Sequence, residues 1–321
     1  MTINLRRRTL LQACGLGLAA PLLYPHALPA SRLAPAAPPV PPTSTLPPGA
    51  GSARLFQLTP GPDYQLHDAV HANCLAFGPR GQRVIDLLVE APVFGDTDPV
   101  AAQVPEAAGF DGSDWLALII DAADPQALAD ASAAAQHLAQ QDIDLRFALV
   151  LEGETPPDPT ALMTLNRALD GVVLLGPPAA GPDQRVAPWT SAPETAMTLL
   201  EHFLIPLGLI GIDLFDVRSM LRQGLGMHRA IGAHCQSSPE TVFFTPFGLV
   251  ETLNTIANDE PLAQAQAAML WLAGGLDFRL DEFDATGATL ADRAPAALKM
   301  FGIGISPQME VGSRSLVLLY G

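Results

Sequence analysis

Buried strand-like segments alternate with helix-like segments along the first half of the chain, and this order constrains the fold more than any other feature. The strand candidates are Ala72 to Phe77, Trp115 to Ile120, Arg146 to Leu151 and Gly171 to Leu175. The helix candidates between them are Val84 to Val89, Ala127 to Gln140 and Ala161 to Leu169. Strands that are joined through helices run parallel in one sheet. The sequence therefore predicts an α/β fold whose N-terminal domain is Rossmann-like.

The second half continues with a helix from Pro193 to Leu204, for which Ser191 is the expected N-cap. We expect this helix to be central and to join the two halves. Further strands are expected at Gly226 to His234, Ala268 to Ala273, Met300 to Ile305 and Ser315 to Tyr320, and further helices at Phe247 to Ile256 and Leu280 to Leu290. These elements predict a second, smaller sheet with its own helices.

The first thirty residues have the layout of an export signal. Arg6 to Gln12 precede an apolar run from Ala13 to Leu23, and small residues follow up to Ala30. The segment resembles a twin-arginine leader with Arg7 and Arg8 as the pair, which implies an exported or periplasmic protein. A disordered basic leader on a cytoplasmic protein is the alternative. The run is too short to span a bilayer comfortably, and residues 31–53 are expected to be a Pro/Ala-rich linker.

Charge excludes one class of function. The 321 residues carry a net charge of −16, and Lys299 is the single lysine. No basic stripe is available to neutralise phosphates, so we do not expect the protein to bind nucleic acid. Cys74 and Cys235 each lie among apolar neighbours and are expected to be buried free thiols.

Two carboxylates lie three residues apart in the apolar stretch from Gly208 to Leu221. Asp213 and Asp216 precede a helix-like segment, so Asp216 could be the cap of that helix. The alternative is that the pair is catalytic and polarises a water molecule at the junction of two elements. In that case the group it acts on must come from elsewhere, since no phosphate-binding loop is nearby.

A strand, a glycine turn and a helix occur in the order of a phosphate-binding unit from Ala72 to Val89. Gly78 and Gly81 are the cofactor-binding candidates in that turn. The fingerprint is weak because Pro79 lacks a backbone donor, and a plain α/β turn is favoured. Asp121 and Asp124 follow the next strand, Trp115 to Ile120. They are best interpreted as helix caps, and their negative charge would repel phosphate.

The spacing of the histidines does not indicate a metal site, and we expect no bound metal ion. His228 and His234 share strand parity beside Cys235, but no further ligand is in phase with them. His67 and His71 have a ligand spacing only if they lie on a helix, and Gly61-Pro62 nearby makes a loop an equal alternative.

Two blocks in the second half resemble FtsZ, the bacterial relative of tubulin. The stretch Gly208 to Arg218 is similar to the synergy loop of that family, Asn-x-Asp-x-x-Asp-Val-Arg, with Gly211 in the place of the Asn. The stretch Gly274 to Gly287 is similar to the family's Ala-Gly-Phe-Asp-Leu-Arg-Leu-Asp-Glu-Phe block. The resemblance implies a shortened, degenerate GTPase domain over residues 54–190, a central helix over 191–207, and an α+β two-layer sandwich over 208–321.

The resemblance also frames three functional hypotheses. The first is an FtsZ-like structural, assembly or regulatory protein that has lost the GTP-binding signature, needs no cofactor, and contacts itself or FtsZ through the face from Gly208 to Arg218. The second is a cell-division GTPase whose site is completed between subunits, with Asp213 and Asp216 acting in trans on GTP and Mg²⁺. The third is an exported binding protein that uses the fold as a frame.

Overall fold

The computed structural model describes residues 53–58, 72–90, 100–103, 110, 113–176, 186–188, 192–204, 208–210, 212–223, 226–236, 247–257, 260–305 and 309–321. All of them belong to one compact unit, Pro42–Gly321. The expected leader, His67, His71, Ser191 and Gly211 lie outside the described residues. Among the described helices, none has the length and apolar character that crossing a membrane requires.

The first half contains strands that alternate with helices, as the sequence predicts. The strands are β1 (Arg54–Leu58), β2 (Ala72–Phe77), β3 (Val100–Gln103), β4 (Ser113–Asp121), β5 (Ile143–Leu151), β6 (Gly171–Leu175) and β7 (Val186–Pro188). The helices are α2 (Gly78–Glu90), α3 (Pro125–Leu138), α4 (Pro159–Ala168) and the central helix α5 (Ala192–Leu204). Proline stands near the first position of α3 and α4, where its missing N–H costs nothing.

The second half supplies the rest of the sheet and its covering helices. Its strands are β8 (Gly208–Ile210), β9 (Met227–Gln236), β10 (Ala267–Gly274), β11 (Leu298–Ile305) and β12 (Ser313–Tyr320). Its helices are α6 (Leu214–Leu221), α7 (Phe247–Ile256), α8 (Glu260–Ala263) and α9 (Leu280–Arg293).

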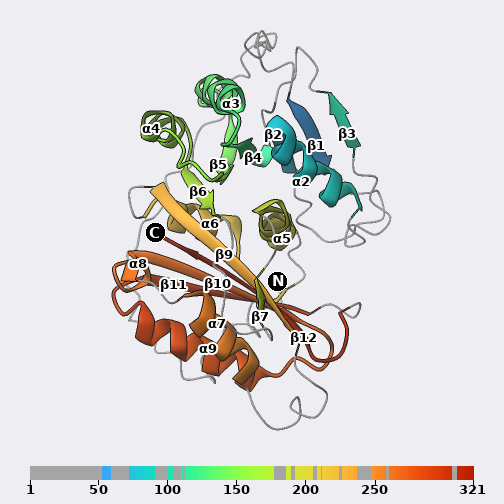
Figure 1. Ribbon diagram of the computed structural model, residues 1–321, viewed down its shortest axis with the longest axis vertical. Coiled ribbons are helices and arrows are strands. Elements are labelled where there is room, and N and C mark those ends of the chain that lie inside the picture. The colour runs from blue at the N-terminus through green and yellow to red at the C-terminus, as the bar shows by residue number, and fades with distance from the viewer. Residues whose placement is uncertain are drawn as a thin grey trace, which may run out of the picture. The chain divides into compact units, whose positions relative to one another are not determined.

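The described strands form a single 12-stranded sheet in the order β3-β1-β2-β4-β5-β6-β9-β12-β10-β11-β8, with β7 beside β9 (Figure 1). From β2 to β9 all neighbours are parallel, which confirms the Rossmann-like expectation. The long strand β9 joins the halves, because it pairs with β6 over its first residues and with β12 along most of its length. The second, smaller sheet that the sequence predicted is not separate: its strands continue the same sheet into the second half, where they are mixed parallel and antiparallel.

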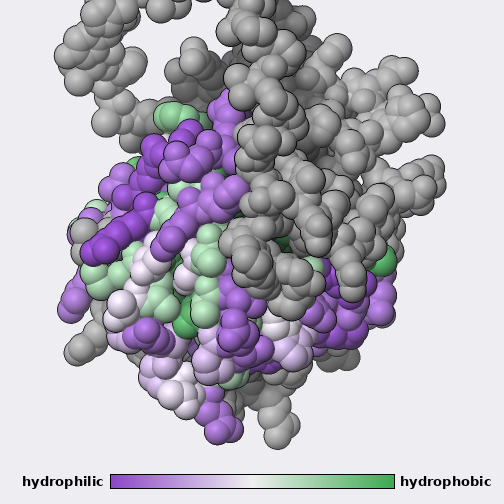
Figure 2. Space-filling view, turned by 90° about the horizontal axis from the view of Figure 1, so that it is seen from above, coloured by the Kyte–Doolittle hydropathy of each residue, from purple (hydrophilic) through white to green (hydrophobic). Residues whose placement is uncertain are grey.

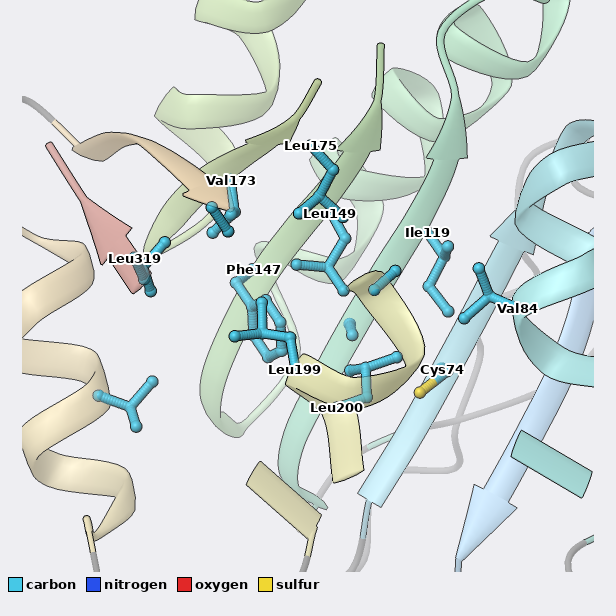
Figure 3. Packing of buried hydrophobic residues seen from close by; sticks show 14 of the residues in the cluster. Cys74, Val84, Ile119, Phe147, Leu149, Val173, Leu175, Leu199, Leu200 and Leu319 are labelled. Atoms are coloured by element: carbon cyan, nitrogen blue, oxygen red, sulfur yellow. The ribbon is translucent and has the colours of Figure 1, made fainter. Parts of the chain in front are cut away.

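Helices cover the parallel strands on both faces. The core under α2 and α5 includes Cys74, Val84, Phe147 and Leu199, and extends to Leu319 of β12 (Figure 3). The core on the other face lies under α3 and α4, and a third core lies between α7, α9 and the strands of the second half. Because α5 packs on the first core, it ties the parallel strands to the second half.

The surface is mixed in character. In the view from above, hydrophilic and pale residues cover much of the visible described surface, with hydrophobic residues in small groups among them (Figure 2). Seven large hydrophobic side chains among the described residues are exposed: Val89, Met163, Phe215, Leu276, Leu280, Leu298 and Val311. Cys74 and Cys235 are buried and free, as expected, and burial raises the pKa of both thiols.

Candidate functional site

The carboxyl ends of parallel strands form the edge at which open α/β sheets bind their ligands. At this edge β2 continues directly into α2, so the expected glycine turn is reduced to Gly78, whose φ is 75°. A Cβ at Gly78 would lie 2.7 Å from Cβ of Asp121, and one at Gly81 would lie 2.7 Å from the carbonyl oxygen of Ile119. Glycine at both positions therefore lets α2 pack closely against β4.

Arg80 lies across the ends of β4 and β5. Its Nε and Nη2 donate to Oδ1 of Asp121 at 2.8 and 2.5 Å. Its Nη2 also donates to the carbonyl of Leu151 at 2.9 Å, and its Nη1 donates to the carbonyl of Glu152 at 3.0 Å. An arginine side chain has five N–H donors, and these contacts use four of them.

Asp121 is the acceptor that holds this arrangement. It is 4% exposed, and its Oδ2 accepts the backbone N–H of Arg80 at 3.1 Å. Burial by itself would raise the pKa of this carboxyl group, but the hydrogen bonds and charge of Arg80 lower the pKa below its usual value. A carboxylate thus accepts a first-turn amide of α2, which is where a helix N-terminus would otherwise bind an anion.

The two aspartates that were interpreted as caps have different roles. Asp124 is the N-cap of α3, since its Oδ1 accepts the backbone N–H of Gln126 at 2.9 Å. Asp121 is the last residue of β4 and not the cap; it binds Arg80 and accepts the amide of Ala123. The interpretation of Asp121 was wrong because its partner lies 41 residues away and no local pattern indicates it.

A second ion pair closes the same edge. Arg229 of β9 donates to both carboxylate oxygens of Glu152, at 3.0 and 3.3 Å. A Cβ at Gly176 would lie 2.9 Å from Oε2 of Glu152, so glycine leaves room for that carboxylate. The ends of β4, β5 and β9 are therefore connected through side chains.

The Asp213 and Asp216 pair lies at the start of α6. Asp213 is the N-cap, and its Oδ1 accepts the backbone N–H of Asp216 at 2.8 Å. The alternative in which Asp216 caps this helix was wrong: α6 begins at Leu214, three residues before Val217, where the sequence indicated its start. Burial, followed by the charge of Asp213, raises the pKa of Asp216.

The other end of the Gly208–Arg218 segment is tied to the parallel strands. Arg218 points to Asp170, which precedes β6, and its Nε lies 3.4 Å from Oδ1 of that residue. Phe215 is 75% exposed between the two carboxylates. The face from Gly208 to Arg218 thus presents a hydrophobic ring beside Asp213, while Arg218 is structural.

The Gly274 to Gly287 block contains a buried ion network. Arg314 of β12 donates from Nε and Nη2 to the two carboxylate oxygens of Glu282 at 2.8 and 2.9 Å, and from Nη2 to Oδ2 of Asp277 at 3.1 Å. Its guanidinium carbon also lies 5.4 Å from the centre of the Phe278 ring. The conspicuous acidic residues of the block therefore hold β12 against the start of α9.

Histidines play structural parts where they are described. His228 is buried, and its Nε2 lies 2.9 Å from the carbonyl of Leu221. Burial lowers the pKa of His228 and of His234. In the described ranges no group of three or more His, Cys, Asp or Glu side chains could hold a metal ion.

Sequence reasoning missed Arg80 and Arg314, which organise these two networks. The sequence contained a signal for Arg80. A positive charge in the first turn of a helix interacts unfavourably with the helix dipole, so an acidic partner nearby is expected. Asp121, at the end of the neighbouring strand, is that partner.

A parallel sheet with helices on both faces, a central helix and a mixed second half define an α/β fold like that of FtsZ. The chain is similar to a tryptophan-to-tyrosine mutant of FtsZ from M. jannaschii, with a TM-score of 0.51, 19% identity, and 65% of each chain covered. It is also similar to an empty FtsZ dimer from M. jannaschii, with a TM-score of 0.50 and 19% identity, over 66% of this chain and 64% of that one. The match thus spans slightly less than two thirds of the length of those FtsZ chains.

A third similar structure is GDP-bound CetZ1 from Haloferax volcanii, with a TM-score of 0.49 and 13% identity, over 76% of this chain and 92% of that one. No model of a protein family and no curated protein sequence matches the chain. The matches to the two FtsZ structures show that the fold of the described residues is FtsZ-like, which confirms the fold that the resemblance implied.

Proposed function

We propose that this protein is an FtsZ-like assembly or regulatory protein that acts without binding or hydrolysing GTP. The observation that supports this proposal most is the Arg80–Asp121 pair at the carboxyl edge of the sheet. Asp121 accepts both the backbone amide and the guanidinium of Arg80, the groups that a phosphate at the start of α2 would need.

Charge at the same edge supports the proposal further. Asp124 and Glu152 add two carboxylates beside Asp121. Arg229 forms an ion pair with Glu152 and with no other acidic residue that the structure describes. Pro79 contributes no amide to the first turn of α2. A triphosphate would have to displace Arg80 from a buried carboxylate and leave that charge unpaired, which costs about 2–3 kcal/mol for this partly buried pair.

A protein partner fits the face from Gly208 to Arg218. Phe215 is 75% exposed there and Asp213 is exposed, so the face combines an aromatic anchor with a charge. Aromatic residues of this kind are enriched at protein interfaces. One of the similar FtsZ structures is a dimer, and the partner proposed here is a second copy of this chain or an FtsZ protein.

Assembly tests the proposal directly. We expect the purified protein to remain a monomer or small oligomer with GTP and Mg²⁺, and to shorten the filaments of an added FtsZ, since only one of the two surfaces of an open filament is present. Light scattering and electron microscopy measure both effects. Asp213→Asn combined with Asp216→Asn should weaken the shortening, and because asparagine also caps helices, α6 should persist.

The matched control replaces two exposed aspartates of α9, Asp284→Asn with Asp292→Asn, and should leave the shortening unchanged. GTP-dependent filaments of this protein alone would contradict the proposal. Equal shortening by the Asp213 and Asp216 variant would remove these residues from the contact face.

We also propose that the protein is exported in the folded state through its leader, in which case its partner is a second copy of this chain and not FtsZ, which works in the cytoplasm. Residues 1–50, fused to a reporter that is active only after export of a folded protein, should direct export. Arg7→Lys with Arg8→Lys should abolish the signal, whereas Arg6→Lys, the matched control outside the pair, should retain most of it. A reporter that stays cytoplasmic would contradict export.

A further inference from the structure

A pocket of about 420 Å³ lies at the amino ends of the parallel strands, on the edge opposite Arg80. Residues immediately before or early in β5, β6 and β9 contribute to it, together with the last turn of α4 and the end of α6. The polar and glycine residues of its wall that matter here are Arg146, Asn166, Arg167, Asp170, Arg222 and Gly226.

Asp170 binds Arg146 and Arg222 of the pocket wall and holds them in place. Its side chain is 3% exposed, and its Oδ1 accepts Nε and Nη2 of Arg222 at 3.0 and 2.5 Å and Nε of Arg218 at 3.4 Å. Its Oδ2 accepts the backbone N–H of Arg146 at 2.9 Å. Both oxygens are therefore engaged, so this carboxylate positions Arg222, whose side chain is half exposed.

Arg146 has a separate, structural task in the wall. Its Nη1 donates to the carbonyls of Leu138 and Ala139, the end of α3, at 3.2 and 3.1 Å. A cation at this place satisfies the carbonyls that a helix C-terminus leaves unpaired. Its Nε is buried and has no hydrogen-bond partner among the described residues.

Arg167, in the last turn of α4, is the third arginine of the pocket lining. It forms no ion pair with another described residue. Three arginines thus line the pocket against the single carboxylate of Asp170, and the exposed Asp142 and Asp144 are not part of the lining. In a chain whose net charge is −16, a local excess of about two positive charges favours the binding of an anion, and a phosphate monoester carries a charge of about −1.5 to −2 near pH 7.

We propose that this pocket binds the phosphate group of a small phosphorylated molecule, with Arg167 and Arg222 as the ligands of the phosphate. Guanidinium groups match phosphate oxygens by paired hydrogen bonds, and the volume lies within the range of small-molecule sites. Gly226, with φ of 73°, shapes the wall, because a Cβ there would lie 2.4 Å from Oδ1 of Asn166. The pocket is on the other edge of the sheet, so its function does not depend on whether the carboxyl edge binds nucleotide.

Calorimetric titration of the full chain with inorganic phosphate at low ionic strength tests this proposal. We expect saturable binding with a Kd on the order of 1 mM, weakened at least tenfold in Arg167→Gln. Arg167 is the deciding variant, since Arg222→Gln also removes a partner of Asp170. Arg83→Gln, an exposed arginine of α2, is the matched control and should bind phosphate as the original chain does.

Three results would overturn the proposal. The first is the absence of saturable binding up to roughly 50 mM phosphate, about fifty times the expected Kd. The second is equal phosphate affinity in the original chain and in Arg167→Gln. The third is binding of acetate as tight as that of phosphate, which would make the pocket a site for carboxylates, such as those of an acidic protein partner.

Discussion

Arg314→Met should lower the free energy of unfolding by about 3–5 kcal/mol, because it leaves buried carboxylates without their cation. The Arg314 side chain is 3% exposed, and its guanidinium pairs with Glu282 and Asp277. Methionine fills much of the volume but supplies no donor. Urea denaturation at neutral pH, followed by circular dichroism, measures the change.

Arg279→Met is the matched control for this result. Arg279 pairs with Asp281 in the same block, but both side chains are about half exposed. An exposed ion pair contributes little, on the order of 0.5 kcal/mol. If the two variants lose similar stability, or if Arg314→Met loses less than about 1 kcal/mol, the buried network is not what holds β12 to α9.

Arg80→Met should lower the free energy of unfolding by about 2–3 kcal/mol at neutral pH, and the loss should shrink in acid. Arg80 lowers the pKa of Asp121 in the folded state. A carboxyl group with a lowered folded pKa stabilises the protein above its unfolded pKa, about 3.9, and that contribution disappears as the pH falls through the folded pKa. Without Arg80, burial instead raises the pKa of Asp121, so protonation removes the penalty.

The measurement is the difference in unfolding free energy between the original chain and Arg80→Met, taken at about pH 7 and about pH 3. Arg83→Met is the control, since Arg83 is exposed on the same helix and lies 3.9 Å from Glu90. A difference that stays constant with pH would show that the loss comes from packing and not from the ion pair with Asp121.

Most of the sheet could be predicted because its buried strands are local patterns. The strands β2, β4, β5 and β6 contain apolar runs, and a helix follows directly after β2, β4 and β5 in the order of elements. The edge strand β3 and its neighbour β1 were not predicted; they are four and five residues long, and strands this short lack a periodicity that separates them from loops.

The site was less predictable than the fold. The candidates in it were chosen by residue type and spacing, and Gly78 was located correctly at the strand end. The ion pairs that occupy the site join residues that are distant in sequence. Arg80 and Asp121 are 41 residues apart, and Arg229 and Glu152 are 77 residues apart. Such pairs depend on how parallel strands are ordered in the sheet, which single-sequence patterns do not encode.

We propose that the ion pair between Arg80 and Asp121 takes the place of a nucleotide at the carboxyl edge of the FtsZ-like sheet. Calorimetric titration of the purified protein with GTP and Mg²⁺ tests this proposal. We predict no saturable binding at micromolar concentrations, since Asp121 already engages Arg80. Saturable GTP binding with a Kd below about 10 µM, roughly 7 kcal/mol of affinity, would contradict the proposal and favour a GTPase.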